Sequence, residues 1–129
     1  MPLAQVIPML PVRSMPAAVA FYEKLGFTVE DRNDHWRWAK LHVGAYYLML
    51  DESINAQPDA PRQHVLYLYP EDVHAYHREL REAGLAVPDL STTFYGMTEF
   101  RMEDPDGNPI WIGQQVPPPP QMGSSGSRT

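Results

Sequence analysis

The stretch YGMTEFRMEDPDGNPIWIGQ, residues 95–114, decides the fold. Two strand-like runs, TEFRMED and PIWIG, flank the turn residues PDGN, and this pattern is typical of a β-hairpin. The residues before the hairpin predict, in order, a strand, a helix that Gly84 ends, and an extended piece: 64–70, 71–84 and 85–91. The sequence therefore predicts a unit of strand–helix–strand–strand–strand order that ends at residue 115.

The same order of elements occurs in the first half of the chain. A strand-like run, a capped helix and three further strands are predicted over 5–12, 14–26, 27–33, 36–43 and 46–52. Pro8 and Pro11 have no N–H to donate, so the first strand is expected at a sheet edge or with interrupted pairing. An offset of 58 residues places the helix stop Gly26 on Gly84 and the helix cap Ser14 on Asp72. The same offset pairs Ile7 with Val65 and Met9 with Tyr67, which supports an internal repeat.

Each unit is too small to bury its own sheet face, so we expect the two units to pack into one α+β domain over 1–115. The predicted βαβββ modules cover about 4–53 and 63–115, and the polar, proline-bearing residues 54–62 link them. Residues 116–129 have low complexity, which predicts a disordered tail.

Charge and composition exclude several classes of protein. Asp and Glu number 16 against 10 Lys and Arg, and the net charge of −6 disfavours nucleic acid and anionic membranes as partners. The chain has no cysteine, which excludes disulfides and thiolate chemistry. No run approaches the ~20 apolar residues of a membrane span, and the N-terminus lacks the features of a signal peptide. We therefore expect a cytoplasmic protein.

Two motifs resemble a known superfamily. AFYEKLGFTV, residues 20–29, resembles a helix end of the vicinal oxygen chelate superfamily, which includes glyoxalases, extradiol dioxygenases, fosfomycin-resistance enzymes and bleomycin-resistance proteins. Residues 95–114 resemble the C-terminal hairpin of the bleomycin-resistance branch. The resemblance implies that the two modules form a half-open barrel around a cavity, and that a homodimer often completes the pocket.

The superfamily's enzymes hold a divalent metal with His and Glu side chains at four strand positions. The resemblance places these positions on Ile7, Met49, Val65 and Trp111. A thioether is too soft for such ions, and the other three side chains have no ligand atom. A one-residue shift would bring in His64 next to Val65, but strand alternation would then turn its neighbours away. We therefore predict no metal and no cofactor.

No other catalytic arrangement emerges from the residues. His74 and His77 lie among charged residues of the second helix and are predicted to form a solvated face. The sequence contains no nucleophile elbow, phosphate loop or paired catalytic carboxylates. We therefore expect a protein that is not an enzyme.

Aromatic and soft side chains occupy the positions that would face the cavity. Two-residue alternation, with the WRW run read as a strand that carries both Trp side chains on one face, selects most of the predicted ligand-binding residues. In drug-binding members of the family, a Trp before G-x-E-F stacks on the ligand; Tyr95 takes that place here, in a loop one residue longer. Two carboxylates, Asp51 and Glu99, would select a cation among these aromatics. The predicted ligand-binding residues are Met9, Trp36, Trp38, Tyr47, Met49, Asp51, Tyr67, Tyr69, Tyr95, Glu99 and Trp111.

Three functional hypotheses follow. The leading one is a non-catalytic protein of bleomycin-resistance type, which sequesters a cationic, aromatic-containing drug or metabolite in a cavity lined by a homodimer. The second is a metal-dependent glyoxalase- or dioxygenase-like enzyme with displaced ligands, which would purify with stoichiometric divalent metal. The third is a ligand-free assembly module whose barrel is filled by side chains and whose dimer surface is its purpose.

Overall fold

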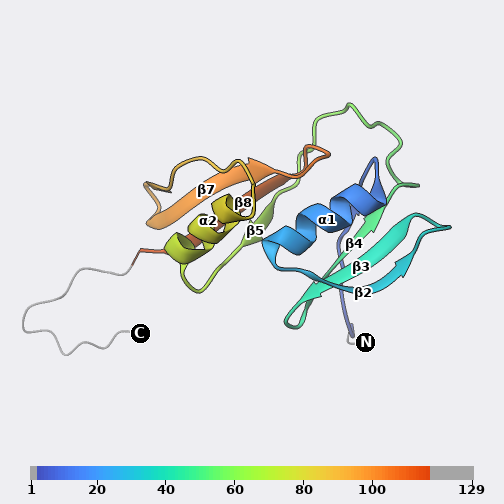
Figure 1. Cartoon of the computed structure of the whole chain (residues 1–129), viewed down its shortest axis with the longest axis horizontal. Helices are drawn as coiled ribbons and strands as arrows, with labels where there is room; N and C mark the ends of the chain where they lie inside the picture. Colours follow the sequence, from blue (N-terminus) through green and yellow to red (C-terminus); the bar gives the residue numbers. More distant parts are fainter. Residues whose placement is uncertain (1–2, 117–129) are drawn as a thin grey trace, which may run out of the picture.

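The computed structural model describes residues 3–116 and contains two modules, which lie side by side in Figure 1. The first module contains β1 (Met9–Pro11), α1 (Met15–Leu25), β2 (Thr28–Asn33), β3 (Trp38–Val43) and β4 (Tyr46–Asp51). The second contains β5 (Leu66–Leu68), α2 (Val73–Glu82), β6 (Ser91–Thr92), β7 (Met97–Glu103) and β8 (Pro109–Gln115). The predicted α+β class and the two βαβββ modules are confirmed.

Each module forms its own four-stranded sheet, and the two sheets have the same strand order. The orders are β1-β4-β3-β2 and β5-β8-β7-β6. In both sheets the first strand runs parallel to the last, which places Met9 opposite Met49 and Tyr67 opposite Trp111. The 58-residue offset therefore pairs positions that are structurally equivalent.

Both helices begin at the predicted caps. The Ser14 hydroxyl accepts a hydrogen bond from the backbone N–H three residues on, and the Asp72 carboxylate accepts from the N–H groups two and three residues on. Gly26 ends α1 with a φ of 113°, in the left-handed region that favours glycine. The second helix ends one residue before the expected glycine, at the cap Ala83, and Gly84 follows with a φ of 90°.

One face of each sheet is buried under its helix, and the two modules share a single core. Leu48 and Leu50 on β4 are buried with residues of α1, while Ile110 and Ile112 on β8 are buried on the side of α2. Side chains alternate along each strand, so the residues between these face away from the helices. These two sheet faces, called the open faces below, are where the predicted ligand-binding strand residues lie.

The turn DPDGN joins the modules as well as turning the chain. The buried Asp104 carboxylate accepts hydrogen bonds from the backbone N–H groups of Asp106 and Asn108 and from the Asn108 side-chain amide. It also accepts a bond of 2.7 Å from the hydroxyl of Tyr22, on α1. Burial, followed by the nearby Asp104 charge, raises the pKa of Tyr22, so its hydroxyl remains a donor. The amide of Asn108 donates in turn to the Pro11 carbonyl, at 3.3 Å.

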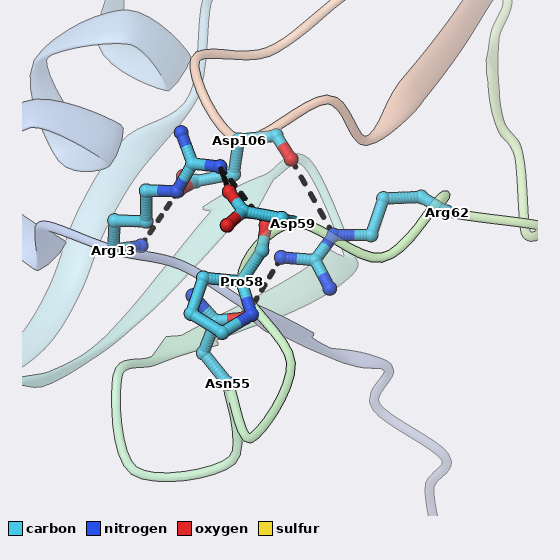
Figure 2. Close-up of polar contacts among 6 residues, drawn as sticks. All are labelled: Arg13, Asn55, Pro58, Asp59, Arg62 and Asp106. Atoms are coloured by element: carbon cyan, nitrogen blue, oxygen red, sulfur yellow. Dashed lines mark hydrogen bonds and ion pairs between the residues drawn. The ribbon is translucent and has the colours of Figure 1, made fainter.

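Two arginines hold the linker against this turn. Figure 2 shows the contacts among Arg13, Asn55, Pro58, Asp59, Arg62 and Asp106. The Arg13 side chain donates to the Pro58 carbonyl and to Asp59, and its backbone N–H donates to the Asp106 carboxylate. The Arg62 guanidinium donates to the Asn55 side chain at 2.8 Å and lies 3.4 Å from the Asp106 carbonyl. Residues 54–62 are therefore tied to both modules.

Several strand predictions were too long. β1 starts at Met9 rather than residue 5, and β5 covers three residues where 64–70 was expected. Residues 85–90 form no regular structure, and β6 begins only at Ser91. Prolines without an N–H lie at or beside these segments, at Pro8, Pro11, Pro70 and Pro88, and each removes a possible ladder bond.

The prediction of a solvated face is wrong for His77. Its side chain is buried, its Nε2 lies 2.7 Å from the Pro88 carbonyl oxygen, and its ring meets Phe100 edge-on at 4.9 Å. His77 follows Val73 by one helical turn and precedes Leu80 by three residues, so it lies on the buried side of α2. This histidine is a packing residue whose nitrogen is paired.

Two further findings concern the chain as a whole. Apart from Val116, the predicted disordered tail lies outside the described residues. Within residues 3–116, no helix has both the length and the apolar character needed to cross a membrane.

Candidate functional site

The open face of the second module carries an aromatic wall made of Tyr67, Tyr69 and Trp111. Tyr67 and Tyr69 alternate along β5 and its continuation, and their rings are stacked with centroids 4.7 Å apart. Trp111 stands on the neighbouring strand β8, and its ring meets the Tyr67 ring edge-on at 6.0 Å. Tyr69 is 70 % exposed, so the wall reaches the surface. The structure thus brings these three predicted residues together.

A buried carboxylate lies behind this wall. Glu99, on β7, is only 2 % exposed and accepts hydrogen bonds from the hydroxyls of Tyr67 and Tyr95, at 2.8 and 2.9 Å. The Arg101 Nε donates to its other oxygen at 2.8 Å. Burial acts to raise the pKa of Glu99, but the hydrogen bonds from Arg101 and the two tyrosines outweigh it, and the pKa lies below its ordinary value. The carboxylate is therefore ionised and already accepts from three donors of the protein.

Arg101 is the residue that sequence reasoning missed. Its guanidinium carbon lies 3.5 Å from the centroid of the Trp111 ring, and its Nη2 donates to the Tyr95 hydroxyl at 3.0 Å. A hydrogen bond to Glu99 raises the pKa of Arg101, so the guanidinium keeps its charge. The signal was present in the hairpin: the turn pairs Glu103 with Pro109, and counting two residues along each strand places Arg101 opposite Trp111.

Gly113 provides the space in which these groups meet. A Cβ at this position would lie 3.0 Å from the Cβ of Glu99 and 3.0 Å from the Tyr67 hydroxyl oxygen. Both distances are tighter than ordinary van der Waals contact. The glycine after IWI thus allows the tyrosine to cross the sheet and reach the carboxylate. Burial, followed by the bond to Glu99, raises the pKa of Tyr67, which remains a hydrogen-bond donor.

The open face of the first module has fewer polar contacts. Met9, Met49 and Lys40 lie side by side on three adjacent strands, because Met49 is opposite both of the others. The Lys40 Nζ lies 4.8 Å from the centroid of the Tyr47 ring, and the His42 ring lies 5.9 Å from it. The structure brings together the predicted Met9, Met49 and Tyr47, and adds Lys40.

Three predicted residues lie apart from both clusters. Trp38 is opposite Asp51 at one end of the first sheet, where the Asp51 carboxylate accepts bonds from the backbone and hydroxyl of Ser53. Trp36 is 69 % exposed in the turn between β2 and β3. The predicted common face of Trp36 and Trp38 is wrong, because β3 starts at Trp38 and Arg37 has a φ of 55°, which breaks the alternation.

A hollow of about 540 Å³ runs along the seam between the sheets. It is lined by residues 8–11, around β1, and by 61–66, which lead into β5. Met9 is 41 % exposed here although it is apolar. The hollow therefore meets the first open face at Met9 and ends at β5, the strand that carries Tyr67.

The residues present do not fit the divalent metal of the superfamily's enzymes. Met49, Val65 and Trp111 offer no oxygen or nitrogen ligand, and Ile7 lies before the start of β1. Between residues 3 and 116, no three His, Cys, Asp or Glu side chains gather in a way that could hold a metal ion. The charged groups of the site, Glu99 and Arg101, pair with each other and do not form a set of metal ligands.

Comparison with known proteins agrees with this architecture. Residues 4–112 match the model of the glyoxalase/bleomycin resistance protein/dioxygenase superfamily. No match was found among curated proteins.

Three solved structures illustrate the range of proteins with this fold. A bleomycin resistance determinant encoded on the transposon Tn5 is 25 % identical, with a TM-score of 0.72, over 88 % of this chain and 98 % of that one. TnmS3, an antibiotic binding protein from Streptomyces sp. CB03234, is 29 % identical, with a TM-score of 0.72, over 90 % and 99 %. A lactoylglutathione lyase from Agrobacterium tumefaciens shares the fold at 19 % identity and a TM-score of 0.69, over 88 % and 95 %.

Proposed function

Because the chain belongs to the glyoxalase/bleomycin resistance protein/dioxygenase superfamily, we propose that it binds and sequesters a small molecule with a flat aromatic ring, without catalysing a reaction on it. The observation that carries this proposal is the aromatic wall of Tyr67, Tyr69 and Trp111, set around the Arg101–Glu99 pair. The likeness to a bleomycin resistance determinant and to an antibiotic binding protein supports it.

The chemistry of the site supports binding rather than catalysis. A general base needs a free acceptor within reach of the substrate, whereas Glu99 is buried and accepts from three donors. A fold shared with a lyase does not decide the matter, since one fold hosts many functions. The residues at the family's metal positions support binding, because they cannot polarise a substrate oxygen.

A hollow beside the first open face is also large enough for a small molecule, although Tyr67, Tyr69 and Trp111 do not line it. Its volume of about 540 Å³ falls within the range of roughly 300–1,000 Å³ that is usual for small-molecule sites. Aromatic side chains offer large, rigid contact surfaces, and the Tyr67 hydroxyl already has a partner in Glu99. A protein of this kind would protect a cell by mass action, lowering the free concentration of a drug or toxic metabolite.

The charge of the ligand is a separate part of the proposal. The sequence predicts a cationic ligand, selected by Asp51 and Glu99 and favoured by the net charge of −6. The charge of Glu99 is compensated by Arg101, and Asp51, the other predicted carboxylate, lies apart from the aromatic wall. An aromatic ligand consequently has stronger support than a cationic one, and the test must vary ligand charge.

We also propose that the protein is a homodimer. β1 and β5 are edge strands with one unpaired side each, and the hollow runs between them. A second copy would cover these edges and close the site around a ligand, as the leading hypothesis expects. Size-exclusion chromatography with light scattering would give twice the chain mass of 14.7 kDa for a dimer, whereas a monomer mass at micromolar concentration would contradict it.

A tryptophan fluorescence titration tests the proposed function. Chelator-treated protein is titrated with flat aromatic compounds of positive, neutral and negative charge, including a bleomycin-type glycopeptide, and calorimetry measures the variants. Trp111→Leu is expected to weaken binding by at least about 10-fold, since it removes an aromatic anchor. Trp36→Leu, in the exposed turn, is the matched control and should bind as the parent protein does. Absence of saturable binding by every compound would overturn the proposal.

Metal analysis distinguishes the enzymatic alternative. Protein purified without chelator should contain no stoichiometric divalent metal. A stoichiometric metal that supports turnover would favour a lyase or dioxygenase instead.

A further inference from the structure

We propose that Arg101 determines ligand specificity: its guanidinium stacks on the ligand ring, and its remaining N–H groups select a ring that carries an anionic or strongly accepting oxygen. The proposal rests on the proposed function, because it concerns the same site. It names the chemical class of ligand that this site would take, which is a flat aromatic acid or a ring bearing phenolate, quinone or carboxylate oxygens.

The Arg101 guanidinium contacts three residues of the site. One of its faces lies against the Trp111 ring, and one of its edges contacts Glu99 and Tyr95. The Arg101 side chain is nevertheless 51 % exposed. About half of the side chain is thus left uncovered by Trp111, Glu99, Tyr95 and their neighbours. A guanidinium face is weakly hydrated and stacks readily on aromatic rings, so a flat ring could extend the Trp111–Arg101 stack.

The Arg101 guanidinium keeps N–H donors that a ligand could use. The structure shows two guanidinium donations, from Nε to Glu99 and from Nη2 to Tyr95. Among residues 3–116 it shows no acceptor for the Nη1 group. Hydrogen bonds from a guanidinium to a charged oxygen are shorter and stronger than neutral ones. A ring substituent with such an oxygen would use donors that are otherwise left to water.

The positive charge of the Arg101–Glu99 pair is more exposed to solvent than the negative charge. Glu99 is buried, and Arg101 lies on its exposed side. A ligand that approaches the wall from solvent meets the positive group first, while the negative charge is screened behind it and shared among three donors. A cationic ring would face repulsion from Arg101, so this part of the site disfavours the cation that the sequence predicts.

Hydrogen bonds within the protein preorganise the Arg101 side chain. Arg101 is held at one edge by Glu99, which is in turn held by Tyr67 and Tyr95. The ordering of this long side chain is therefore complete before a ligand arrives, and the binding free energy is not reduced by it. A lysine could keep the charge, but it has no flat face for stacking and cannot present the same planar array of donors.

Three matched probes test the proposal on the full-length protein: anthracene-2-carboxylate, its neutral methyl ester and 2-(aminomethyl)anthracene. Their own fluorescence anisotropy gives Kd without depending on the tryptophans. The parent protein should bind the carboxylate about 10-fold more tightly than the aminomethyl compound. Arg101→Gln and Arg101→Lys should both lose this preference. Arg81→Gln is the matched control, because Arg81 also pairs with a carboxylate and is 49 % exposed, but lies on α2 away from the site.

A double variant guards against misfolding. Glu99→Gln/Arg101→Gln removes both charges together, so neither is left unpaired, and it too should lose the preference. Circular dichroism and a thermal scan show whether each variant folds, and Kd values are compared only among folded variants.

The outcomes separate the specificity proposal from the proposed function. Equal binding of the three probes, or preference for the aminomethyl compound, would overturn the role of Arg101 and leave sequestration intact. A preference that survives in Arg101→Lys would overturn the stacking geometry. Failure of the parent protein to bind any of the probes, or any compound of the wider panel, would overturn both.

Discussion

The open faces of the two modules have the same frame and different chemistry. Each places a cation over an aromatic ring: Lys40 lies 4.8 Å from the Tyr47 ring centroid, and Arg101 lies 3.5 Å from that of Trp111. Only in the second module is this cation tied to a buried carboxylate that two tyrosines also contact. The repeated fold therefore supplies the frame, whereas the polar network of one module supplies the site.

Strand order explains the difference. Glu99 lies on β7, an inner strand flanked by β6 and β8, and the Tyr67 and Tyr95 hydroxyls meet over it. The acid near Lys40 is Glu30, which lies on the edge strand β2 at 3.8 Å, with both side chains partly exposed. An ion pair in water contributes little, because both partners keep their hydration. The acid of such a pair is therefore buried when it lies on the inner strand β7, and partly exposed when it lies on the edge strand β2.

The largest test of this contrast removes the acid from each face. Glu99→Ala leaves Arg101 and two tyrosine hydroxyls without their acceptor and opens a space in the sheet, so it should lower the free energy of unfolding by about 2 kcal/mol. Glu30→Ala should change it by less than about 0.5 kcal/mol. Urea unfolding of both variants measures the difference, and equal effects would mean that strand position is not what separates the faces.

A second test uses Gly113, because the side chains of Glu99 and Tyr67 pack closely around it. The Cβ of Gly113→Ala would crowd Glu99 and the Tyr67 hydroxyl at 3.0 Å each. Crowding should cost more than the gain from a less flexible unfolded chain, leaving a net loss of about 1 kcal/mol. In a Tyr67→Phe background the hydroxyl is gone, so the loss should shrink. An unchanged loss in the double variant would assign the crowding to Glu99 and to Met97, whose side chain would lie 3.2 Å from the added Cβ.

Sequence reasoning recovered most of the fold because its signals are local. Ser14 and Asp72 cap their helices as predicted, and the DPDGN turn forms the predicted hairpin. The 58-residue offset also located equivalent positions in the two sheets. Strand ends were less predictable, because proline placement limits pairing in ways that alternation alone does not reveal, as at Pro8.

The site was predictable in part. Alternation placed Tyr67 and Trp111 on one face, the resemblance to the family added Glu99 nearby, and the structure brings the three together. Alternation could not show that the negative charge of Glu99 is compensated. That depends on Arg101, which lies beside Glu99 on the same face, and on Tyr95, which reaches Glu99 from a loop. The cross-strand register was the available signal, and it points to Arg101.

The third test is pH. Because the pKa of Glu99 is lowered in the fold, its contribution to stability is present above the unfolded value of about 4.3 and is lost as the pH falls through the folded value. Glu99→Gln removes this contribution, so the variant should lose less stability than the parent between neutral pH and about pH 3. Burial raises the pKa of Asp106, which has the opposite effect, but this is common to both proteins and cancels in the comparison. Parallel urea curves at each pH measure the difference, and identical pH dependence would show that folding does not lower the pKa of Glu99.

The smallest expected effect lies on the first face, and it defines the lower end of the contrast. Lys40→Met removes a cation from the Tyr47 ring and from Glu30, yet both contacts are loose and partly exposed, so the free energy of unfolding should change by no more than about 0.5 kcal/mol. Arg101→Met should lower it further than Lys40→Met does, because Glu99 remains buried and loses its charged donor. Urea unfolding of the two variants side by side gives the ranking. If Lys40→Met proved as costly as Arg101→Met, the first face would hold a network as strong as the second, and the search for the ligand would have to include both modules.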